Sequence, residues 1–306
     1  MDPFGVKANL LAMATSSFLA FRAHKRKSLT PGGSIAAFAV AFFLVGTGLR
    51  GMNLLTFYFI SIKATKYKKE IKATIDGTIA SHEGSTTRGT SQVLACSLLA
   101  TILSLVHAIY CGAERSVVFP QKIDADSSDI DVVMLSSQLT CGIVAHHATC
   151  LADTLASEMG ILSKSSPRLI TQPWKRVPSG TNGGVTLTGF FWSAMGGAII
   201  GISTILLDYI SGIEGIDVVY AFRMILFSLT CGLVGSIFDS LLGATVQQSY
   251  FDPDTKMVYQ EEDCRPKSTK LVVSHSMNFL TNELVNLVSV FITTLLGATI
   301  LGPIFF

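Results

Sequence analysis

Three carboxylates lie in stretches of the sequence that are otherwise apolar. Asp153 and Glu158 belong to A-D-T-L-A-S-E-M-G, and Asp239 belongs to G-S-I-F-D-S-L-L-G. A carboxylate at the centre of a membrane helix costs about 2.5 to 3.5 kcal/mol on insertion scales, so such residues are rare and mostly functional. Pairing with a cation on a neighbouring helix is one explanation. The explanation that we favour is that the three acids handle a metal ion or a substrate.

The spacing of these acids limits how they can act together. Asp153 and Glu158 are five residues apart, which separates them by roughly 140° around an ideal helix, so they cannot chelate one ion without a distortion. Asp153 and Asp239 belong to different helices and can hold Mg²⁺ through oxygen ligands while substrate phosphates complete its coordination. We therefore predict a metal site at Asp153 and Asp239. Small or polar residues recur on the Asp239 helix every three or four positions, at Ser236, Ser240, Gly243 and Gln247.

A glycine-rich segment, V-P-S-G-T-N-G-G-V-T at residues 177–186, stands directly before a long apolar run. Glycines let backbone N–H groups converge on an anion, and the following helix adds the positive end of its dipole. A Walker A loop would need Lys and then Ser or Thr after the last glycine, which this segment lacks. A turn that only starts the helix at the membrane surface is the alternative. The residues expected to bind nucleotide phosphates are Gly180, Thr181, Asn182, Gly183 and Gly184.

Cations beside the polar motifs are candidates for neutralising phosphate charge. Arg88 in T-R-G-T-S-Q and Arg168 after a proline each adjoin such a motif, and the guanidinium fork suits a phosphate group. We place Lys66, as a point charge, with the nucleotide-binding residues. For most of the lysines the alternative is that they only set the orientation in the membrane.

The composition indicates an integral membrane protein. Of 306 residues, 49% are hydrophobic and 14% are charged, whereas about a quarter of the residues in soluble domains are charged. The net charge of +2, with no basic patch among aromatic residues, argues against nucleic acid as a partner. The six cysteines form no CxxC pair, so no disulfide framework is inferred.

Several apolar runs approach the roughly 20 residues that a helix needs to cross a bilayer. We predict an all-α, polytopic transmembrane helix bundle with about six to eight spans, which forms a single integral membrane domain over residues 1–306. Half-helices and an internal repeat are further expectations. The clearest spans are residues 92–111, 185–207, 218–238 and 284–305, and residues 131–162 are less apolar but helical. Aqueous loops are expected at about residues 63–90, 113–130, 163–184 and 248–275.

The N-terminal part has two possible topologies. Glycines at positions 46, 48 and 51 interrupt the apolar run 34–62, in which Arg50 is the one charged residue. The run is either one tilted helix or two half-helices, and the second arrangement puts the basic segments 22–27 and 63–72 on one side, as the positive-inside rule favours. The earlier run 8–21 is followed by its basic residues, so we predict a retained helix whose C-terminal end is cytoplasmic, not a cleaved signal peptide.

Two segments resemble each other. C-G-I-V-A at 141–145 precedes D-T-L at 153–155, and C-G-L-V-G at 231–235 precedes D-S-L at 239–241. A duplicated helix that brings two aspartates together across a pseudo-twofold axis explains the likeness. Chance similarity between membrane segments of low diversity is the alternative.

Five motifs in order cover most of the chain. They are R-G-T-S-Q-V-L-A (88–95), A-D-T-L-A-S-E-M-G (152–160), S-K-S-S-P-R-L-I-T (163–171), V-P-S-G-T-N-G-G-V-T (177–186) and G-S-I-F-D-S-L-L-G-A-T-V-Q (235–247). With these motifs, and with T-N-E-L-V-N-L-V-S near the end, the sequence resembles the transmembrane protein 19 family, or domain of unknown function 92. That family is similar to the chloroplast phytyl-phosphate kinase of tocopherol synthesis. Cys96, where the family pattern has Asn, and T-N-E at 281–283, where it has L-D-N, depart from it.

The resemblance implies an enzyme that passes a nucleotide γ-phosphoryl group to an isoprenyl monophosphate. We expect a kinase that needs Mg²⁺ and a nucleoside triphosphate, CTP or ATP, and acts on a membrane lipid or isoprenoid phosphate in the endoplasmic reticulum or another endomembrane. A transporter or flippase of a phosphorylated lipid or small solute is the alternative, because glycine-broken helices and buried carboxylates suit it equally. The candidate catalytic residues are Asp153, Glu158, Asp239, Arg88 and Arg168.

Overall fold

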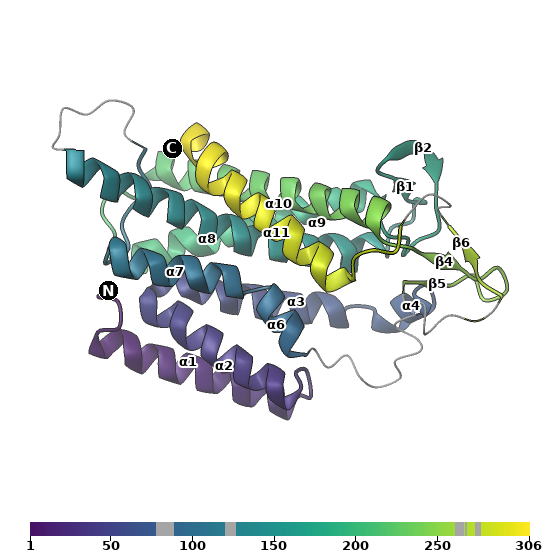
Figure 1. Cartoon of the computed structure of the whole chain (residues 1–306), viewed down its shortest axis with the longest axis horizontal. Coiled ribbons are helices and arrows are strands. Elements are labelled where there is room, and N and C mark those ends of the chain that lie inside the picture. The colour runs from purple at the N-terminus through teal and green to yellow at the C-terminus, as the bar shows by residue number, and fades with distance from the viewer. Residues whose placement is uncertain (78–88, 120–126, 261–265, 267, 273–276) are drawn as a thin grey trace.

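Long apolar helices make up most of the molecule, since a helix satisfies its own backbone hydrogen bonds, as a lipid environment requires. The computed structural model describes residues 1–77, 89–119, 127–260, 266, 268–272 and 277–306. In these residues the long helices run side by side in an elongated bundle (Figure 1). Both termini lie toward the end of the bundle that is opposite two small β-sheets.

The first two helices, α1 (Val6–Lys25) and α2 (Pro31–Thr47), form an antiparallel hairpin. The side chain of Thr30 caps α2 by accepting a hydrogen bond from the amide of Gly33, and Pro31 occupies the first turn. The N-terminal run is therefore part of the bundle, as expected of a retained helix.

The chain turns back between α2 and α3. A short 3-10 helix η1 (Leu49–Met52) leads into α3 (Asn53–Lys66), which runs toward the sheets (Figure 1). A Cβ atom on Gly51 would lie 2.1 Å from the carbonyl oxygen of Leu44, so this close turn needs glycine. Of the two arrangements predicted for residues 34–62, the structure therefore has the split run.

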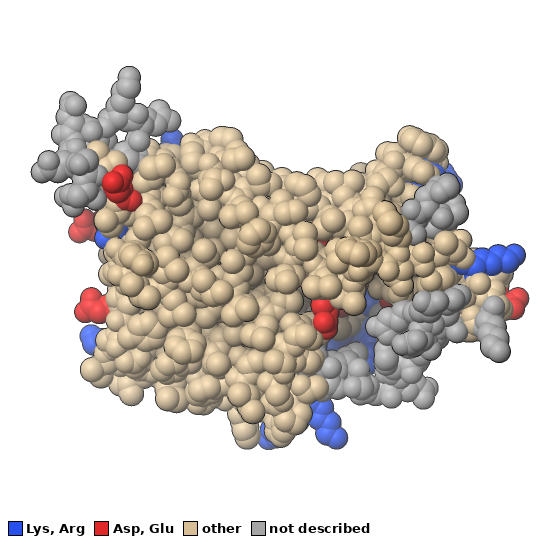
Figure 2. Space-filling model, viewed as in Figure 1, with Lys and Arg blue, Asp and Glu red and all other residues tan. Residues whose placement is uncertain are grey.

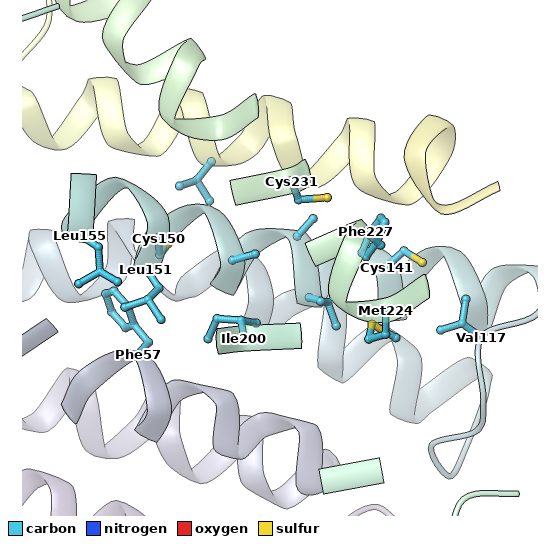
Figure 3. Packing of buried hydrophobic residues seen from close by; sticks show 14 of the residues in the cluster. Phe57, Val117, Cys141, Cys150, Leu151, Leu155, Ile200, Met224, Phe227 and Cys231 are labelled. Atoms are coloured by element: carbon cyan, nitrogen blue, oxygen red, sulfur yellow. The ribbon is translucent and has the colours of Figure 1, made fainter. Parts of the chain in front are cut away.

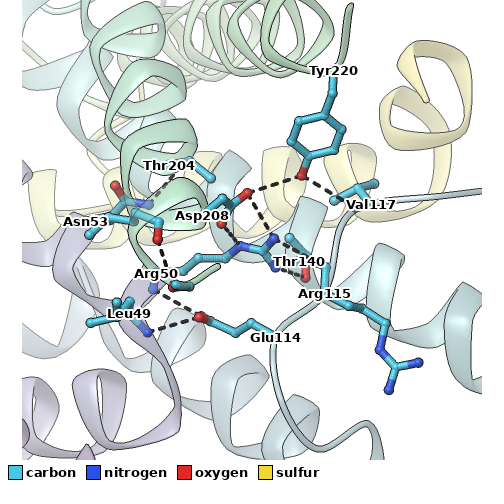
Figure 4. A network of polar contacts seen from close by, with 12 residues as sticks. Leu49, Arg50, Asn53, Glu114, Arg115, Val117, Thr140, Thr204, Asp208 and Tyr220 are labelled. Atoms are coloured by element: carbon cyan, nitrogen blue, oxygen red, sulfur yellow. Dashed lines mark hydrogen bonds and ion pairs between the residues drawn. The ribbon is translucent and has the colours of Figure 1, made fainter. Parts of the chain in front are cut away.

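The turn before α3 carries a buried arginine (Figure 4). Arg50 Nε donates to Asp208 Oδ1 at 2.6 Å, and Arg50 Nη2 donates to Asp208 Oδ2 at 3.0 Å. The same guanidinium donates to the hydroxyl of Thr140 and to the carbonyl of Arg115, while the hydroxyl of Tyr220 donates to Asp208. This network ties three helices together at the end of the bundle that carries the termini.

The middle of the chain contains a long central helix, α8. The bounds are α4 (Lys69–Ala73), α6 (Thr90–Ala95), α7 (Leu98–Tyr110) and α8 (Ser127–Gly160). Residues 92–111 do not form one continuous helix, because the helix breaks between α6 and α7, and whether they cross the membrane stays a prediction. At the break, the carbonyl of Cys96 accepts hydrogen bonds from His146 Nε2 and Cys150 Sγ, so side chains of α8 take the place of the helical partner.

The remaining helices are α9 (Leu187–Ile210), α10 (Val218–Val246) and α11 (Asn282–Leu296), which continues through the π-helical turn η2 (Gly297–Leu301) into α12 (Gly302–Phe305). Within the described residues, three helices are long and apolar enough to cross a membrane alone: Leu187–Ile210, Val218–Val246 and Asn282–Phe305. The α2 and α7 helices are apolar but shorter. The structure is thus a helical membrane bundle, and the number of spans stays a prediction.

Helix α8 lies at the centre of the hydrophobic core. It packs on α9, α10, α11, α7 and α3. Leu151 of α8, Ile200 of α9, and Met224 and Phe227 of α10 are fully buried and meet in one cluster (Figure 3). Glycines allow close helix contact here, since a Cβ atom on Gly196 would lie 2.6 Å from the Cα atom of Ala152.

Two antiparallel three-stranded sheets lie at one end of the bundle (Figure 1). The first has the order β2-β1-β3 and the second has the order β5-β4-β6. The strands are β1 (Arg168–Leu169), β2 (Gln172–Arg176), β3 (Gly184–Val185), β4 (Tyr250–Phe251), β5 (Val258–Tyr259) and β6 (Lys270–Leu271). The chain is therefore mostly helical and not all-α, because the expected loops 163–184 and 248–275 contain short strands. Buried Leu169, Val177 and Ala244 anchor the first sheet to α10.

Charged side chains are sparse on the side of the bundle shown in Figure 2 and gather near the ends of the helices. This distribution suits helices whose middle parts face hydrocarbon.

Candidate functional site

A polar cavity of about 340 Å³ lies at the end of the bundle that carries the sheets. Its walls come from α4, α8, α10, α11 and the glycine-rich segment. The predicted site residues that line it are Asp153, Glu158, Asp239, Gly180, Thr181, Asn182, Gly183 and Gly184. Segments far apart in the sequence thus meet at one cavity, where the chain leaves the apolar bundle.

Asp153 of α8 and Asp239 of α10 contact each other through their side chains. Both helices run toward the sheets and pack together, and Cys141 and Cys231, at equivalent places in the two similar segments, belong to one core cluster. This placement suits a duplicated helix, which stays a prediction. Two carboxylates in contact repel each other unless a proton or a cation lies between them. The pair can therefore share a proton or hold a cation.

Two side chains of helix α11 donate hydrogen bonds to the Asp239 carboxylate. Ser289 Oγ donates to Asp239 Oδ2 at 3.4 Å. The amide of Asn286, oriented with its nitrogen toward the carboxylate, donates to the same oxygen at 3.0 Å. Sequence reasoning did not select these residues, although they stand three apart in T-N-E-L-V-N-L-V-S and therefore share a helix face.

Glu158 forms an ion pair with a lysine that the sequence reasoning missed. Lys72 Nζ lies 2.6 Å from Glu158 Oε2 and donates to the carbonyl of Ala64 at 2.7 Å. Lys72 is 1% exposed, although it belongs to a basic segment expected to be solvated. Asp153 and Asp239 form no such ion pair with any described residue. Among the three acids singled out from the sequence, Glu158 is thus the one that forms an ion pair with a described lysine.

The glycine-rich segment is held by hydrogen bonds inside the protein. The amide of Thr181 donates to the carbonyl of Pro178 at 3.3 Å, and the amide of Gly184 donates to the carbonyl of Thr181 at 2.9 Å. The amide of Asn182 donates to Ser249 Oγ at 2.9 Å. These amides were expected to converge on a phosphate, but protein groups already occupy them. The segment therefore forms part of the cavity wall, with three of its five predicted phosphate-binding amides bound to protein groups, and phosphate binding by the segment stays a prediction.

Gly183 allows this segment to lie against α10. Its φ is +72°, in the left-handed region that favours glycine. A Cβ atom at this position would lie 2.4 Å from the Cβ atom of Ala244 and 2.7 Å from its Cα atom. A side chain here would separate the cavity wall from the small-residue stripe of α10.

Two of the three predicted cations, Arg168 and Lys66, do not line the cavity. The guanidinium of Arg168 is exposed and donates to the carbonyl of Pro173 in its own hairpin. Lys66 lines a second cavity beside α3 instead. Arg88 lies outside the described residues. Arg168 and Lys66 are close in sequence to polar motifs, but their side chains lie in the β1–β2 hairpin and in the second cavity, not in the polar cavity.

The donor atoms of the cavity fit Mg²⁺. In the described parts of the chain, no group of three or more His, Cys, Asp or Glu side chains is arranged around a common point. His146 and Cys150 bind the Cys96 carbonyl, so they do not form a zinc site with Asp153. Mg²⁺ keeps several waters and commonly takes one or two carboxylates together with substrate phosphates. Asp153 and Asp239 provide such a pair.

The fold and the cavity define a helical integral membrane protein with a polar site at one end of its bundle. Residues 14–294 match the family described as integral membrane protein DUF92, and the chain belongs to this family. The family expected from the five motifs is thereby confirmed.

Relatives occur in plants, cyanobacteria and archaea. Protein PGR of Arabidopsis thaliana is 34% identical over 289 residues, which are 94% of this chain and 94% of the relative. An uncharacterized membrane protein of Synechocystis is 28% identical over 247 residues, 79% of this chain and 81% of the relative. An uncharacterized membrane protein of Methanocaldococcus jannaschii is 33% identical over 107 residues, 35% of this chain and 40% of the relative. No solved structure matches the chain.

Proposed function

We propose that the polar cavity is the active site of a Mg²⁺-dependent kinase that transfers the γ-phosphoryl group of a nucleoside triphosphate to an isoprenyl or phytyl monophosphate. The observation that carries this proposal is the contact between Asp153 and Asp239 in a polar cavity at the end of an apolar bundle. Phosphoryl transfer depends mainly on positioning and charge neutralisation, and this cavity offers acidic metal ligands next to a lysine.

In this reaction an oxygen of the lipid monophosphate forms a bond to the γ-phosphorus. The bond from the γ-phosphorus to the oxygen bridging the β- and γ-phosphates breaks, which leaves a lipid diphosphate and a nucleoside diphosphate. A monophosphate ester has its second pKa at about 6, so the attacking oxygen is mostly ionised near neutral pH and needs no general base. The acids of the cavity are therefore needed for charge and position, not for proton removal.

Each charged residue then has a separate task. Asp153 and Asp239 would hold Mg²⁺, which when bound would neutralise charge on the transferring phosphates. Asn286 orients Asp239. Lys72 contributes a positive charge to the same wall, and Glu158 holds the ammonium group in place until a phosphate oxygen binds it.

Basic residues favour a cytoplasmic position for the cavity. The basic segments 22–27, 63–72 and 164–176 all adjoin helix or strand ends on the sheet side of the bundle. Because cytoplasmic loops of membrane proteins carry an excess of Lys and Arg, this end faces the cytoplasm, where nucleoside triphosphates are available. The isoprenoid acceptor and the endomembrane location rest on the family resemblance.

The test incubates the purified full chain in detergent with Mg²⁺, γ-labelled CTP or ATP, and isoprenyl monophosphates of several lengths. We expect labelled lipid diphosphate by mass spectrometry, and no such product from Asp153→Asn or Asp239→Asn at normal yield of folded protein. Full activity in both variants would remove the proposal. Unconverted nucleotide and acceptor, together with movement of the lipid phosphate across proteoliposomes, would identify a transporter or flippase instead.

A further inference from the structure

A second cavity, of about 200 Å³, lies between the α1–α2 hairpin and α3. The hairpin packs on α6 and α7, whereas α3 packs on α8 and α9, so the two parts diverge and leave space between them. Most of the cavity wall is apolar and includes Leu19, Val40, Leu54, Phe57 and Ile62. An apolar cavity of this kind favours a hydrocarbon over water.

This apolar cavity borders the polar cavity of the candidate site. Gln92 lines both of them. Lys66 and Lys69, at the end of α3 and the start of α4, line the apolar cavity, and Lys72 lines the polar one. Three lysines that are three residues apart therefore lie along the border between an apolar space and an acidic metal site.

We propose that the apolar cavity binds the hydrocarbon chain of the lipid monophosphate and that its phosphate lies near Gln92, between Lys66 and Lys72. The identity of the headgroup rests on the proposed function. An amphiphile needs apolar and cationic surfaces next to each other, and only a phosphate at the border reaches the lysines while its chain stays in the apolar cavity. Lys66 thereby binds the lipid phosphate, not the nucleotide.

The binding test uses a prenyl monophosphate that carries a photoreactive diazirine on its chain, with the full-length protein in nanodiscs. We expect cross-links in peptides of α2 and α3. Ala37 lines the cavity, and Ala39 is exposed on the same helix, so Ala37→Trp and Ala39→Trp are matched variants. Labelling should fall roughly tenfold in Ala37→Trp and stay unchanged in Ala39→Trp. If Ala37→Trp does not fold, Ala37→Leu adds less bulk at the same place.

Labelling confined to other helices, or equal labelling of Ala37→Trp and wild type, would overturn the inference. A second comparison tests the phosphate position with Lys66→Gln and Lys63→Gln, since Lys63 is exposed and does not line the cavity. Affinity for the phosphorylated probe should fall about tenfold in Lys66→Gln alone, and affinity for the corresponding alcohol should not change. An equal effect on alcohol and phosphate would contradict the lysine contact.

Phosphotransfer assays separate this inference from the proposed function. If labelling depends on Ala37 but no nucleotide yields a lipid diphosphate, the lipid site stands and the kinase proposal fails. If product forms and Ala37→Trp converts long and short acceptors as wild type does, the kinase proposal stands and the lipid site is wrong. Loss of long acceptors with retention of short ones supports both.

Discussion

Two charged clusters lie in this bundle, one at each end, and they differ in how fully their charges are paired. At the end with the termini, the guanidinium of Arg50 binds both oxygens of Asp208, and these side chains are 3% and 0% exposed (Figure 4). At the sheet end, Asp153 and Asp239 contact each other across a cavity and form no ion pair with a described residue. The Arg50–Asp208 cluster is internally paired, whereas Asp153 and Asp239 form no ion pair with a described residue.

Glu114 completes the pairing at the end with the termini. Its carboxylate accepts hydrogen bonds from the amides of Leu49 and Arg50 at 3.0 and 3.1 Å, which fixes the turn before α3. Burial raises the pKa of the Glu114 carboxyl above its ordinary value, and the charge of Arg50 opposes this shift. Every charge in this cluster therefore has a partner within the protein.

On the proposed function, this difference in pairing distinguishes structural charges from functional ones. A buried ion pair with all its hydrogen bonds formed holds helices in register, and removal of one partner leaves an uncompensated charge. Two carboxylates without a cation, on the wall of a cavity, are instead the kind of group for which we propose a ligand from outside. Buried acids in a membrane protein thus have to be judged by their partners, since the two clusters look alike in the sequence.

The largest expected effect is the loss of the Arg50 pair. Arg50→Ala leaves Asp208 buried without a counter-charge and should destabilise the protein by about 3 to 5 kcal/mol, seen as a large fall in Tm in detergent. Arg223→Ala, which removes an exposed arginine from α10, is the control and should leave Tm nearly unchanged. Equal Tm values for the two variants would show that the Arg50–Asp208 pair does not stabilise the fold, which would contradict its structural role.

Replacement of Asp153 or Asp239 should reduce activity without reducing thermal stability, the opposite of what is expected for Arg50→Ala. Asp153→Asn or Asp239→Asn should reduce phosphotransfer by on the order of 100-fold to 1000-fold, as loss of a group that manages transition-state charge does. Tm should hold or rise, because the substitution removes repulsion between like charges. Turnover and Tm are measured together, with Asp254→Asn in an exposed loop as control. Intact turnover with a lowered Tm would make this pair structural as well.

Gly183→Ala sharpens the comparison at the cavity wall. Gly183 and Gly112 have almost equal φ values, +72° and +73°. Of the two, only Gly183 is so close to helix α10 that a Cβ atom would collide with Ala244. Gly112→Ala should cost about 1 kcal/mol for its backbone conformation, and Gly183→Ala should cost about 1 to 3 kcal/mol more through the clash with Ala244. Thermal unfolding of both variants gives the difference, and similar Tm values would argue against the close contact.

The smallest expected effect is at Lys72. Lys72→Met leaves Glu158 unpaired, but the cavity gives this carboxylate access to water, so the loss should be about 1 to 2 kcal/mol, less than for Arg50→Ala. If Lys72 also binds a phosphate, the KM for the lipid monophosphate, whose phosphate we place between Lys66 and Lys72, should rise. Lys63→Met is the exposed control. A fall in Tm as large as that of Arg50→Ala would show that Lys72 is purely structural.

Sequence reasoning found the acids but not most of their partners. Asp153, Glu158 and Asp239 stood out because hydrocarbon disfavours charge, and this signal is local. Lys72 did not stand out, since a lysine in a basic segment looks solvated whether or not it turns inward. Arg168 was predicted in the phosphate site from an adjacent motif, yet its guanidinium binds its own hairpin, and Lys66 lines the second cavity instead of the predicted nucleotide site.

The sequence by itself determined a helical membrane protein, the break in residues 34–62 as one of two arrangements, and the acids that need an explanation. These properties depend on how single segments interact with lipid or water, which composition and spacing express. Only the tertiary structure decided that Asp153 contacts Asp239, that Glu158 pairs with Lys72, and that the amides of Thr181, Asn182 and Gly184 bind protein groups. Such pairings depend on how remote helices pack, and no single segment carries that information.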